Sequence, residues 1–383
     1  MDIPTKKHDG YRTNCIASSN DDSSAPGVIH VQVKGPTKDA SFKESFGKWL
    51  SRFSTEKPLL ERRSKQVVPQ DDPKTRCHTL SDDDWEYLRE VVKEWNFAVE
   101  DLVIEELLGV GTFGTTYKGT CKGSVCAVKK IRVTSDSMRQ FVREVEALSA
   151  VQDPNVVGFK GVVVNQELQA CWIIQEYMAG GTLNDVIRKQ GCAVLAKKSV
   201  SKKLQILRDV AKGMAALQAT TLHRDLKPSN IFLDEMMTAK IGDLGLAKKL
   251  LSGDMTGETG TYLYMAPEVI MHSSYGNSAD VWSWGATVVE VMTCKFPYQD
   301  RLLTPIQIAT EVMQHKMRPE LPQHVTIPKL KDLLDRCCAF DPSKRPTFSE
   351  IAADMDVIIE QQIEEETSQS LNRSWSISNL FEI

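Results

Sequence analysis

One nine-residue segment, LHRDLKPSN at residues 222–230, limits the possible folds more than any other part of the chain. Pro228 forbids a long helix at this point and fixes a loop. Residues 231–233, Ile-Phe-Leu, follow as a strand-like stretch. After a short turn a second strand ends at Asp243, which glycines flank on both sides. The segment therefore predicts a polar loop followed by two short strands.

The polar side chains of this region match the requirements of phosphoryl transfer. That reaction needs a metal held by oxygens, a cation on the phosphates and a carboxylate at the acceptor hydroxyl. Asp243 and Asn230 would supply the hard oxygen ligands that suit Mg²⁺. Lys129 and Lys227 would supply positive charge, and Asp225 the acceptor carboxylate.

A glycine pattern, GVGTFG at residues 109–114, occurs at two unrelated kinds of phosphate site. A dinucleotide-binding turn must open into a helix, whose N–H groups hold the pyrophosphate. Here β-branched and aromatic residues follow at 115–118, and a second strand-like run follows at 125–131. The glycines are therefore expected in a β-hairpin, where a backbone without Cβ atoms can lie close over a phosphate.

The second strand of this hairpin carries a candidate phosphate ligand. Period-two alternation places Val125, Ala127, Lys129 and Ile131 on one face. Small Ala127 leaves room for a flat base, and Lys129 would reach the phosphates. Taken alone, Lys129 is better interpreted as a solvated strand lysine, because lysines are mostly exposed.

A helix is predicted over residues 135–148, where apolar side chains recur at helical spacing. Ser135 can cap its start, and Asp153-Pro154 ends the segment. Glu144 lies beside the apolar stripe, so it either faces inward and pairs with Lys129 or is a surface glutamate like Glu146.

Composition excludes several classes of protein. The net charge of −4 gives no bias toward nucleic acid, and no apolar run is long enough to span a membrane. The nine cysteines lack metal-binding spacing and are interpreted as reduced thiols. The first ten residues, MDIPTKKHDG, carry no apolar core of a signal peptide and no myristoylation glycine. A cytoplasmic protein is expected.

Three regions are expected along the chain. Residues 1–98 are rich in polar side chains and are predicted to be mostly disordered. Residues 102–362 carry the regular apolar periodicity of a folded domain, and residues 363–383 form a polar tail. Within the first region, the apolar residues of 41–53 share one helical face. Two interpretations of this segment are possible, because Gly47 weakens the pattern: a docking helix, or a transient helix in a disordered tail.

Residues 102–362 resemble a eukaryotic protein kinase domain of the Ser/Thr type. The signature blocks occur in order: GVGTFG, CAVKK, Glu144, HRDLKPSN, GDLG, MAPE and DVWSWG. The segments GETGTYLYMAPE and GGTL are similar to the tyrosine-kinase-like group, especially Raf-like and mixed-lineage kinases. The resemblance implies an α+β, bilobal fold with a small β-rich N-lobe, one main helix in it, and a larger helical C-lobe.

The resemblance also implies a role for each matching residue. Lys129 would hold the ATP phosphates and pair with Glu144, Asp225 would orient the acceptor hydroxyl, and Lys227 would lie beside it. Asn230 and Asp243 would hold Mg²⁺. Gln175 would be the gatekeeper, Asp280 would brace the catalytic loop, and Glu268 would pair with Arg345. The implied ATP-binding residues are Leu108, Gly109, Val110, Gly111, Thr112, Phe113, Gly114, Thr115, Thr116, Ala127, Lys129, Glu176 and Met178.

The chain departs from the family pattern at three positions that leave the reacting groups intact. Thr116 replaces a usual valine, Leu244 replaces a usual phenylalanine, and Cys126 is expected as apolar filler facing away from the cleft. The rival function is a nucleotide-binding scaffold without turnover, whose mark would be the loss of Lys129, Asp225 or Asp243. A nicotinamide oxidoreductase is disfavoured, because no acidic residue follows a βαβ unit.

A regulatory segment is expected at residues 256–261, TGETGT, where the family has its activation loop. A phosphate there would add nearly two negative charges, and Arg224 could bind it bidentately. Thr259 is the first candidate and Thr256 the second, whereas Thr261 is expected to be structural. The partners implied are a protein substrate and either an upstream activating kinase or autophosphorylation.

Overall fold

The computed structural model describes residues 80–111, 114–134, 138–188, 193–243, 261–271 and 276–378. Several of the positions discussed above lie outside these ranges: the segment 41–53, Thr112, Phe113, Ser135, Leu244, Thr256 and Thr259.

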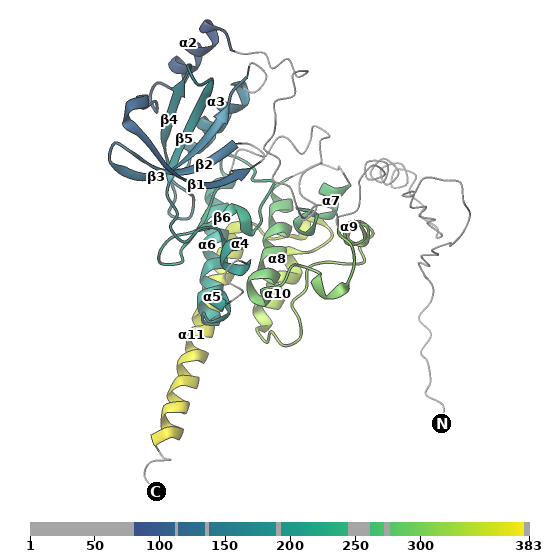
Figure 1. The fold of residues 1–383 in the computed structure, drawn as a ribbon. Helices are drawn as coiled ribbons and strands as arrows, with labels where there is room; N and C mark the ends of the chain where they lie inside the picture. The colour runs from purple at the N-terminus through teal and green to yellow at the C-terminus, as the bar shows by residue number, and fades with distance from the viewer. Residues whose placement is uncertain are drawn as a thin grey trace, which may run out of the picture. The chain divides into compact units, whose positions relative to one another are not determined.

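The N-lobe is an antiparallel five-stranded sheet with the order β1-β2-β3-β5-β4 (Figure 1). Its strands are β1 (Leu102–Gly111), β2 (Gly114–Cys121), β3 (Ser124–Arg132), β4 (Phe159–Asn165) and β5 (Ala170–Glu176). The main helix of this lobe is α3 (Met138–Ser149). The predicted hairpin is confirmed, since Gly111 pairs with Gly114 where β1 turns into β2.

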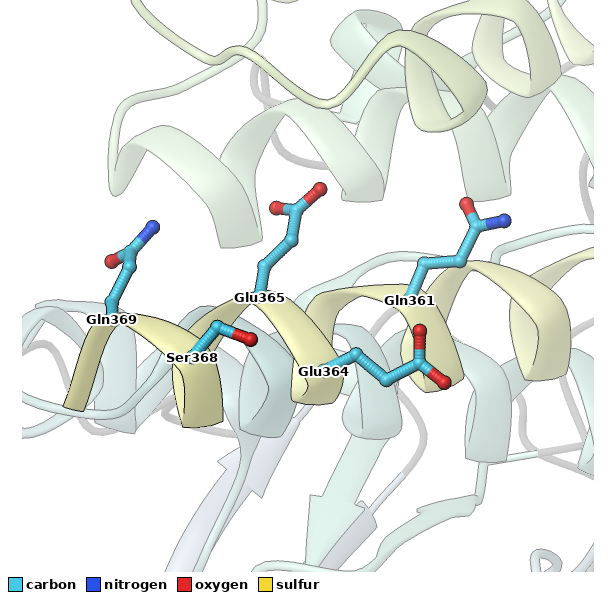
Figure 2. A pocket seen from close by; sticks show the side chains of 5 residues that line it. All are labelled: Gln361, Glu364, Glu365, Ser368 and Gln369. Carbon is cyan, nitrogen blue, oxygen red and sulfur yellow. The ribbon is translucent and has the colours of Figure 1, made fainter. Parts of the chain in front are cut away.

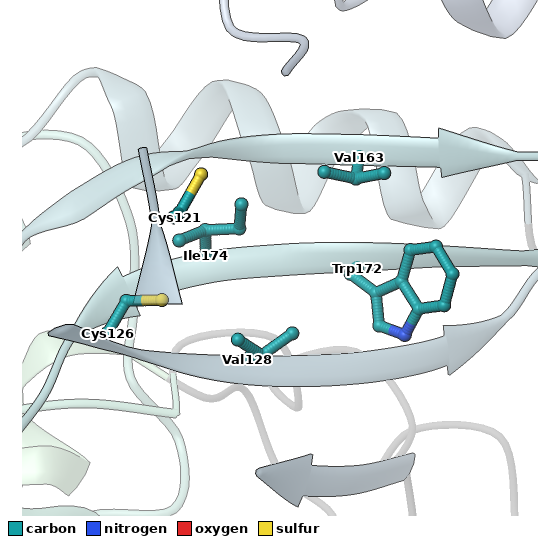
Figure 3. Close-up of a cluster of buried hydrophobic side chains, with 6 residues drawn as sticks. All are labelled: Cys121, Cys126, Val128, Val163, Trp172 and Ile174. Carbon is teal, nitrogen blue, oxygen red and sulfur yellow. The ribbon is translucent and has the colours of Figure 1, made fainter. Parts of the chain in front are cut away.

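Alternation along β3 separates the packed face of the sheet from the cleft face. Cys126 and Val128 are fully buried and pack with Cys121, Val163, Trp172 and Ile174 (Figure 3). Ala127 and Lys129 therefore lie on the opposite face. The prediction that Cys126 is apolar filler facing away from the cleft is confirmed.

The C-lobe is mainly helical, which confirms the α+β class. Its helices are α4 (Leu183–Arg188), α5 (Ala193–Ala196), α6 (Val200–Gln218), α7 (Pro267–Ile270), α8 (Asn277–Thr293), α9 (Pro305–Met313), α10 (Pro328–Cys337) and α11 (Phe348–Ser378). The predicted strands after the polar loop are β6 (Ile231–Leu233) and β7 (Ala239–Ile241), which pair antiparallel. Helix α8 lies at the centre of the lobe, because Trp282 and Trp284 on it are fully buried. None of the helices in the described ranges combines the length and apolar character that crossing a bilayer requires.

Two helices lie at the edges of the expected kinase-like region. The first is at the N-terminal side, where helix α2 (Asp82–Val91) lies within the region predicted to be mostly disordered. Ser81 and Asp84 form a capping box that starts this helix. Trp85, Leu88 and Val92 recur at i, i+3 and i+7 and are fully buried. Surrounding acidic and basic residues hid this short apolar stripe in the sequence pattern.

The second is at the C-terminal side, where a polar tail is expected after residue 362. Helix α11 continues without interruption to Ser378 and extends beyond the other helices (Figure 1). Glutamate and glutamine favour helix, so a polar stretch continues it without burial. Glu366 also accepts hydrogen bonds from the Ser201 backbone N–H (3.0 Å) and hydroxyl (2.8 Å) at the start of α6.

Candidate active site

The polar loop predicted from residues 222–230 is anchored from below by Asp280 at the start of α8. The fully buried Asp280 carboxylate accepts hydrogen bonds from the backbone N–H groups of His223 (3.1 Å) and Arg224 (2.9 Å). Arg224 has a φ of +64°, a conformation that side chains other than glycine seldom adopt. The Asp280 bonds therefore stabilise a strained turn, and the predicted bracing role of Asp280 is confirmed.

His223 connects the loop to the end of β7. Its ring is buried, and its Nδ1 accepts from the backbone N–H of Asp225 at 3.3 Å. Because Nδ1 is an acceptor, Nε2 carries the proton and donates to the Gly242 carbonyl oxygen at 3.1 Å. The sequence analysis assigned no role to His223, although it stands within the HRDLKPSN block.

Two predicted catalytic residues, Asp225 and Lys227, and the predicted metal ligand Asn230 meet at the Asp225 carboxylate. Lys227 Nζ lies 3.0 Å from Asp225 Oδ2. The Asn230 amide nitrogen donates to the same oxygen at 3.0 Å and to the Asp225 carbonyl at 2.7 Å. Asp225 is thus held by charge and by hydrogen bonds, and its carboxylate stays at a defined position beside the cleft.

Lys129 joins the two lobes. Its Nζ lies 3.1 Å from Asp243 Oδ1, after β7, and 3.6 Å from Glu144 Oε1, on α3. Burial alone would lower the pKa of the Lys129 ammonium, but Asp243 and Glu144 outweigh it, so this pKa is raised. Burial also raises the pKa of the Glu144 carboxyl, although the Lys129 charge opposes that shift. The inward-facing interpretation of Glu144 is therefore confirmed.

Asn230 and Asp243 offer oxygen atoms suited to Mg²⁺. Both bonds of Asn230 to Asp225 use the amide nitrogen, so its amide oxygen is the atom left for a cation. Asp243 has a φ of +56° at the end of β7, which presents its carboxylate beside Lys129. No three acidic, histidine or cysteine side chains within the described ranges cluster as metal ligands. Carboxylate and amide oxygens are ligand types that Mg²⁺ takes, so Asn230 and Asp243 are the residues that could hold such an ion.

The hinge is the segment around Glu176 and Met178 at the end of β5. It carries an ion pair that the sequence analysis missed. The Glu176 carboxylate, at the end of β5, accepts from Lys240 Nζ at 2.8 and 2.9 Å. It also accepts from the backbone N–H of Gly158 at 3.1 Å. Glu176 is expected among the ATP-binding residues, and its side chain connects the end of β5 to β7. No local sequence signal identifies this pair, because the partners are 64 positions apart.

The end of β1, within the described part of the predicted nucleotide site, is exposed. Leu108 and Val110 on β1 are exposed, Val110 to 76%. A Cβ on Gly114 would lie 2.1 Å from the Lys130 carbonyl oxygen, so the turn into β2 requires glycine here. Thr115 and Thr116 pair with Lys130 and Lys129 of β3, and Ala127 pairs with Gln175 of β5. The sheet thus places the hairpin, Ala127, Lys129 and the hinge along one edge of the cleft.

Buried polar contacts connect the elements of the C-lobe near the site. Arg345 donates to both oxygens of Glu268, at 2.6 and 3.0 Å, which confirms the predicted pair. A second network was not anticipated: Tyr264 and Arg188 both donate to the buried Glu290 carboxylate. It connects the segment before α7 with α8 and α4.

A shallow hollow elsewhere on the molecule carries none of these residues. Its lining comes from α11 alone (Figure 2): Gln361, Glu364, Glu365, Ser368 and Gln369. The catalytic and nucleotide-binding candidates come instead from the region where Lys129 of the N-lobe meets Asp243 of the C-lobe.

Comparison with known proteins agrees with this geometry. The family model for the protein kinase domain matches residues 102–355. Serine/threonine-protein kinase STY46 of Arabidopsis thaliana is 38% identical over 279 residues, covering 71% of this chain and 46% of that protein. Serine/threonine/tyrosine-protein kinase HT1 of the same plant is 33% identical, covering 70% and 69%. Human mitogen-activated protein kinase kinase kinase 11 is 32% identical, covering 74% and 35%. The chain spans about half the length of STY46 and of STY17, another Arabidopsis relative.

Proposed function

Because the chain belongs to the protein kinase family, we propose that it transfers the γ-phosphoryl group of ATP to serine and threonine hydroxyls of protein substrates. The observation that carries this proposal is the convergence of Asp225, Lys227 and Asn230 next to the Lys129–Asp243 pair. The relatives STY17 and STY46 are both named serine/threonine-protein kinases, which supports the choice of acceptor.

The roles of the individual side chains follow from this arrangement. Asp225 accepts or orients the proton of the acceptor hydroxyl, and Lys227 and Asn230 keep its carboxylate in place. Lys129 holds the α- and β-phosphates, and Glu144 holds Lys129. Asn230 and Asp243 would bind Mg²⁺, which neutralises charge on the phosphate oxygens when it is bound.

The adenine and ribose would lie between the glycine hairpin and the hinge. The hairpin residues Leu108 to Thr116 would cover the phosphates, and Ala127 would leave room for the base. The Glu176 carbonyl and the Met178 N–H would bind the adenine edge. The Glu176–Lys240 ion pair supports this proposal because it holds the hinge to β7 without using the Glu176 backbone carbonyl.

Regulation through the segment at residues 256–261 is part of the same proposal. A phosphate on Thr259, or secondarily on Thr256, would bind Arg224 and order the acceptor platform. The phosphate would come from an upstream kinase or from autophosphorylation. Mass spectrometry of the active protein checks this together with the Thr256→Ala/Thr259→Ala double variant. Full activity of that variant, with no phosphate on the segment, would contradict the role.

A cytoplasmic location with reduced thiols is also proposed. Cys121, Cys126, Cys171, Cys294, Cys337 and Cys338 are free cysteines. Burial raises the pKa of the Cys171 thiol to about 12, so its reactive thiolate is scarce at neutral pH. Fractionation of cells expressing the full chain tests the location, and recovery in the membrane or secreted fraction would contradict it.

Labelled ATP tests the catalytic proposal. The full chain is incubated with γ-labelled ATP, Mg²⁺ and a generic protein acceptor, and the labelled amino acids are then separated. We expect phosphoserine and phosphothreonine with the wild type and no label with Lys129→Met. Nucleotide binding without transfer would favour the rival function, a scaffold that does not turn over ATP.

A further inference from the structure

Helix α2 precedes the residues that match the kinase domain, yet it is packed into the same fold. The match begins at residue 102, whereas α2 covers Asp82–Val91. Its side chains Trp85 and Leu88 are fully buried, as is Val92 directly after it. An appendage without a structural role would not bury Trp85 completely.

The segment after α2 extends the N-lobe sheet at its edge. The Phe97 N–H donates to the Val162 carbonyl at 2.8 Å, and the Val162 N–H donates to the Trp95 carbonyl at 2.9 Å. Strand β4, which carries Val162, is the outermost strand of the sheet. Residues 95–97 therefore cover an edge that would otherwise present unpaired backbone groups.

Gly161 on β4 is adapted to this close approach. A Cβ at this position would lie 2.4 Å from the Phe97 ring and 2.5 Å from the Trp95 carbonyl oxygen. No real side chain tolerates such distances, and the φ of +156° at Gly161 adds strain for any other residue. The kinase-domain sheet is thus shaped to receive the preceding segment.

Polar contacts hold both ends of α2 to the turn between β4 and β5. The Gln166 amide nitrogen donates to Asp82 Oδ1 at 2.6 Å, in the first turn of the helix. The Arg89 guanidinium, in the last turn, donates to the Gln166 amide oxygen. One glutamine therefore fixes the position of α2 along its axis.

Helix α2 also contacts α3, the helix that carries Glu144. Helix α3 in turn contacts β4. The Glu144–Lys129 distance of 3.6 Å is close to the limit of about 4 Å for an ion pair. A small displacement of α3 away from the sheet is therefore enough to break this pair.

We propose that residues 80–97 are a positioning element that holds α3 against the sheet and keeps Glu144 within reach of Lys129. Trp85 is the main positioning residue, because its removal leaves a cavity into which neighbouring elements relax. The proposal concerns this chain's own segment outside the family match, and its catalytic consequence rests on the proposed function.

Amide hydrogen exchange of the full chain tests the proposal directly. In Trp85→Ala we expect the amides of α3 to exchange about tenfold faster or more, while those of α8 remain protected. The KM for ATP should rise by about fivefold or more, within the usual range of coupling between sites. Helix α8 serves as the internal reference for global unfolding.

Two matched variants separate positioning from general damage. Trp85→Phe should recover most of the α3 protection, since the Trp85 indole nitrogen makes no hydrogen bond within the described part of the chain. Tyr87→Ala, on the exposed face of the same helix (52% exposed), should behave as wild type. Arg89→Ala removes only the contact to Gln166 and should raise α3 exchange by about fivefold, the usual effect of one hydrogen bond.

The outcomes that would overturn the proposal are specific. Unchanged α3 exchange in both Trp85→Ala and Arg89→Ala would do so, as would equal acceleration in α3 and α8. If Trp85→Ala does not fold, Arg89→Ala alone decides. Amide exchange does not depend on phosphoryl transfer. A wild-type chain without kinase activity would therefore overturn the proposed function, whereas the exchange rates of the α3 amides would still decide the positioning role.

Discussion

The two sides of the cleft are built in different ways. On the C-lobe side, residues 223–243 are held by hydrogen bonds from buried groups of the same lobe, chiefly Asp280 and His223. On the N-lobe side, Lys129 is held by single ion pairs to carboxylates on two separate elements, α3 and the end of β7. The glycine hairpin above it is exposed.

Because of this difference, the position of Asp225 and the position of Lys129 depend on separate parts of the molecule. The Asp225 carboxylate, which we propose acts on the acceptor hydroxyl, has its supports Lys227 and Asn230 in the C-lobe, so its position does not depend on the N-lobe. The position of Lys129, which we propose holds the phosphates, depends on where α3 lies. Substitutions on the C-lobe side should therefore lower kcat or the free energy of unfolding. Substitutions on the N-lobe side should alter the affinity for nucleotide and its dependence on pH.

The largest effect is expected from Asp225→Asn. The amide keeps the shape but removes the carboxylate at the acceptor, so kcat should fall by about 10²–10⁴-fold. Steady-state phosphorylation of a protein acceptor measures this, with the exposed Asp300→Asn as the control. An unchanged kcat would show that Asp225 does not act on the acceptor.

Arg345→Ala should have the largest effect on stability. It leaves the Glu268 carboxylate buried without its partner and removes bonds to the Ala339 and Ser278 carbonyls. The free energy of unfolding should fall by about 3–5 kcal/mol. Denaturant unfolding measures it, and Arg301→Ala, which removes an exposed pair with Glu320, should change it by less than about 0.5 kcal/mol. Equal losses in the two variants would contradict the distinction between buried and exposed pairs.

An effect of intermediate size on activity is expected when Glu144 is protonated or replaced. Burial raises the pKa of Glu144 above its ordinary 4.5, so the carboxyl gains its proton, and the ion pair with Lys129 is lost, at a pH above that value. Activity should fall as the pH drops through this raised pKa. The contribution of Glu144 to the free energy of unfolding has the opposite pH dependence to that of activity. It is fully present below pH 4.5 and is lost as the pH rises through the raised pKa.

Glu144→Gln tests this dependence. The variant should lower kcat/KM for ATP by about tenfold at neutral pH, equivalent to about 1.4 kcal/mol. Its acid limb should also be shallower than that of the wild type. The pH profile of kcat/KM in both proteins is the measurement, and an identical acid limb would mean that Glu144 does not control it.

The smallest effect is expected at the hinge. Lys240→Met removes the ion pair with the partly exposed Glu176, and such pairs contribute about 0.2–1 kcal/mol. The KM for ATP should change by no more than about fivefold, with kcat unchanged. Isothermal titration with a non-hydrolysable ATP analogue checks the affinity. A loss of kcat as large as that of Asp225→Asn would show that the hinge pair belongs to the catalytic side.

Sequence analysis predicted the parts of the fold that local pattern and the family blocks determine. The hairpin around GVGTFG follows from β-branched flanks, and the loop at 222–230 follows from Pro228 and the strand after it. The Glu268–Arg345 pair follows from the family positions alone. Helix α2 was missed because its two buried side chains, Trp85 and Leu88, stand among charged residues.

Contacts between distant positions had no sequence signal. Arg188 and Glu290 are separated by 102 positions, and nothing near either residue indicates the other. The helical continuation of α11 to Ser378 was missed for a different reason, since a polar stretch is compatible with both helix and tail. What escaped prediction is thus mainly tertiary: which charged groups meet, and which flanking helices pack on the domain.

The affinity of Asp225→Asn and Glu144→Gln for Mg²⁺-ATP, measured by the same titration, tests the difference between the two sides most directly. Both substitutions exchange a carboxylate for an amide, one on each side of the cleft. The account predicts affinity within about twofold of wild type for Asp225→Asn, and a loss of about fivefold or more for Glu144→Gln. Weakened binding in Asp225→Asn with unchanged binding in Glu144→Gln would contradict it.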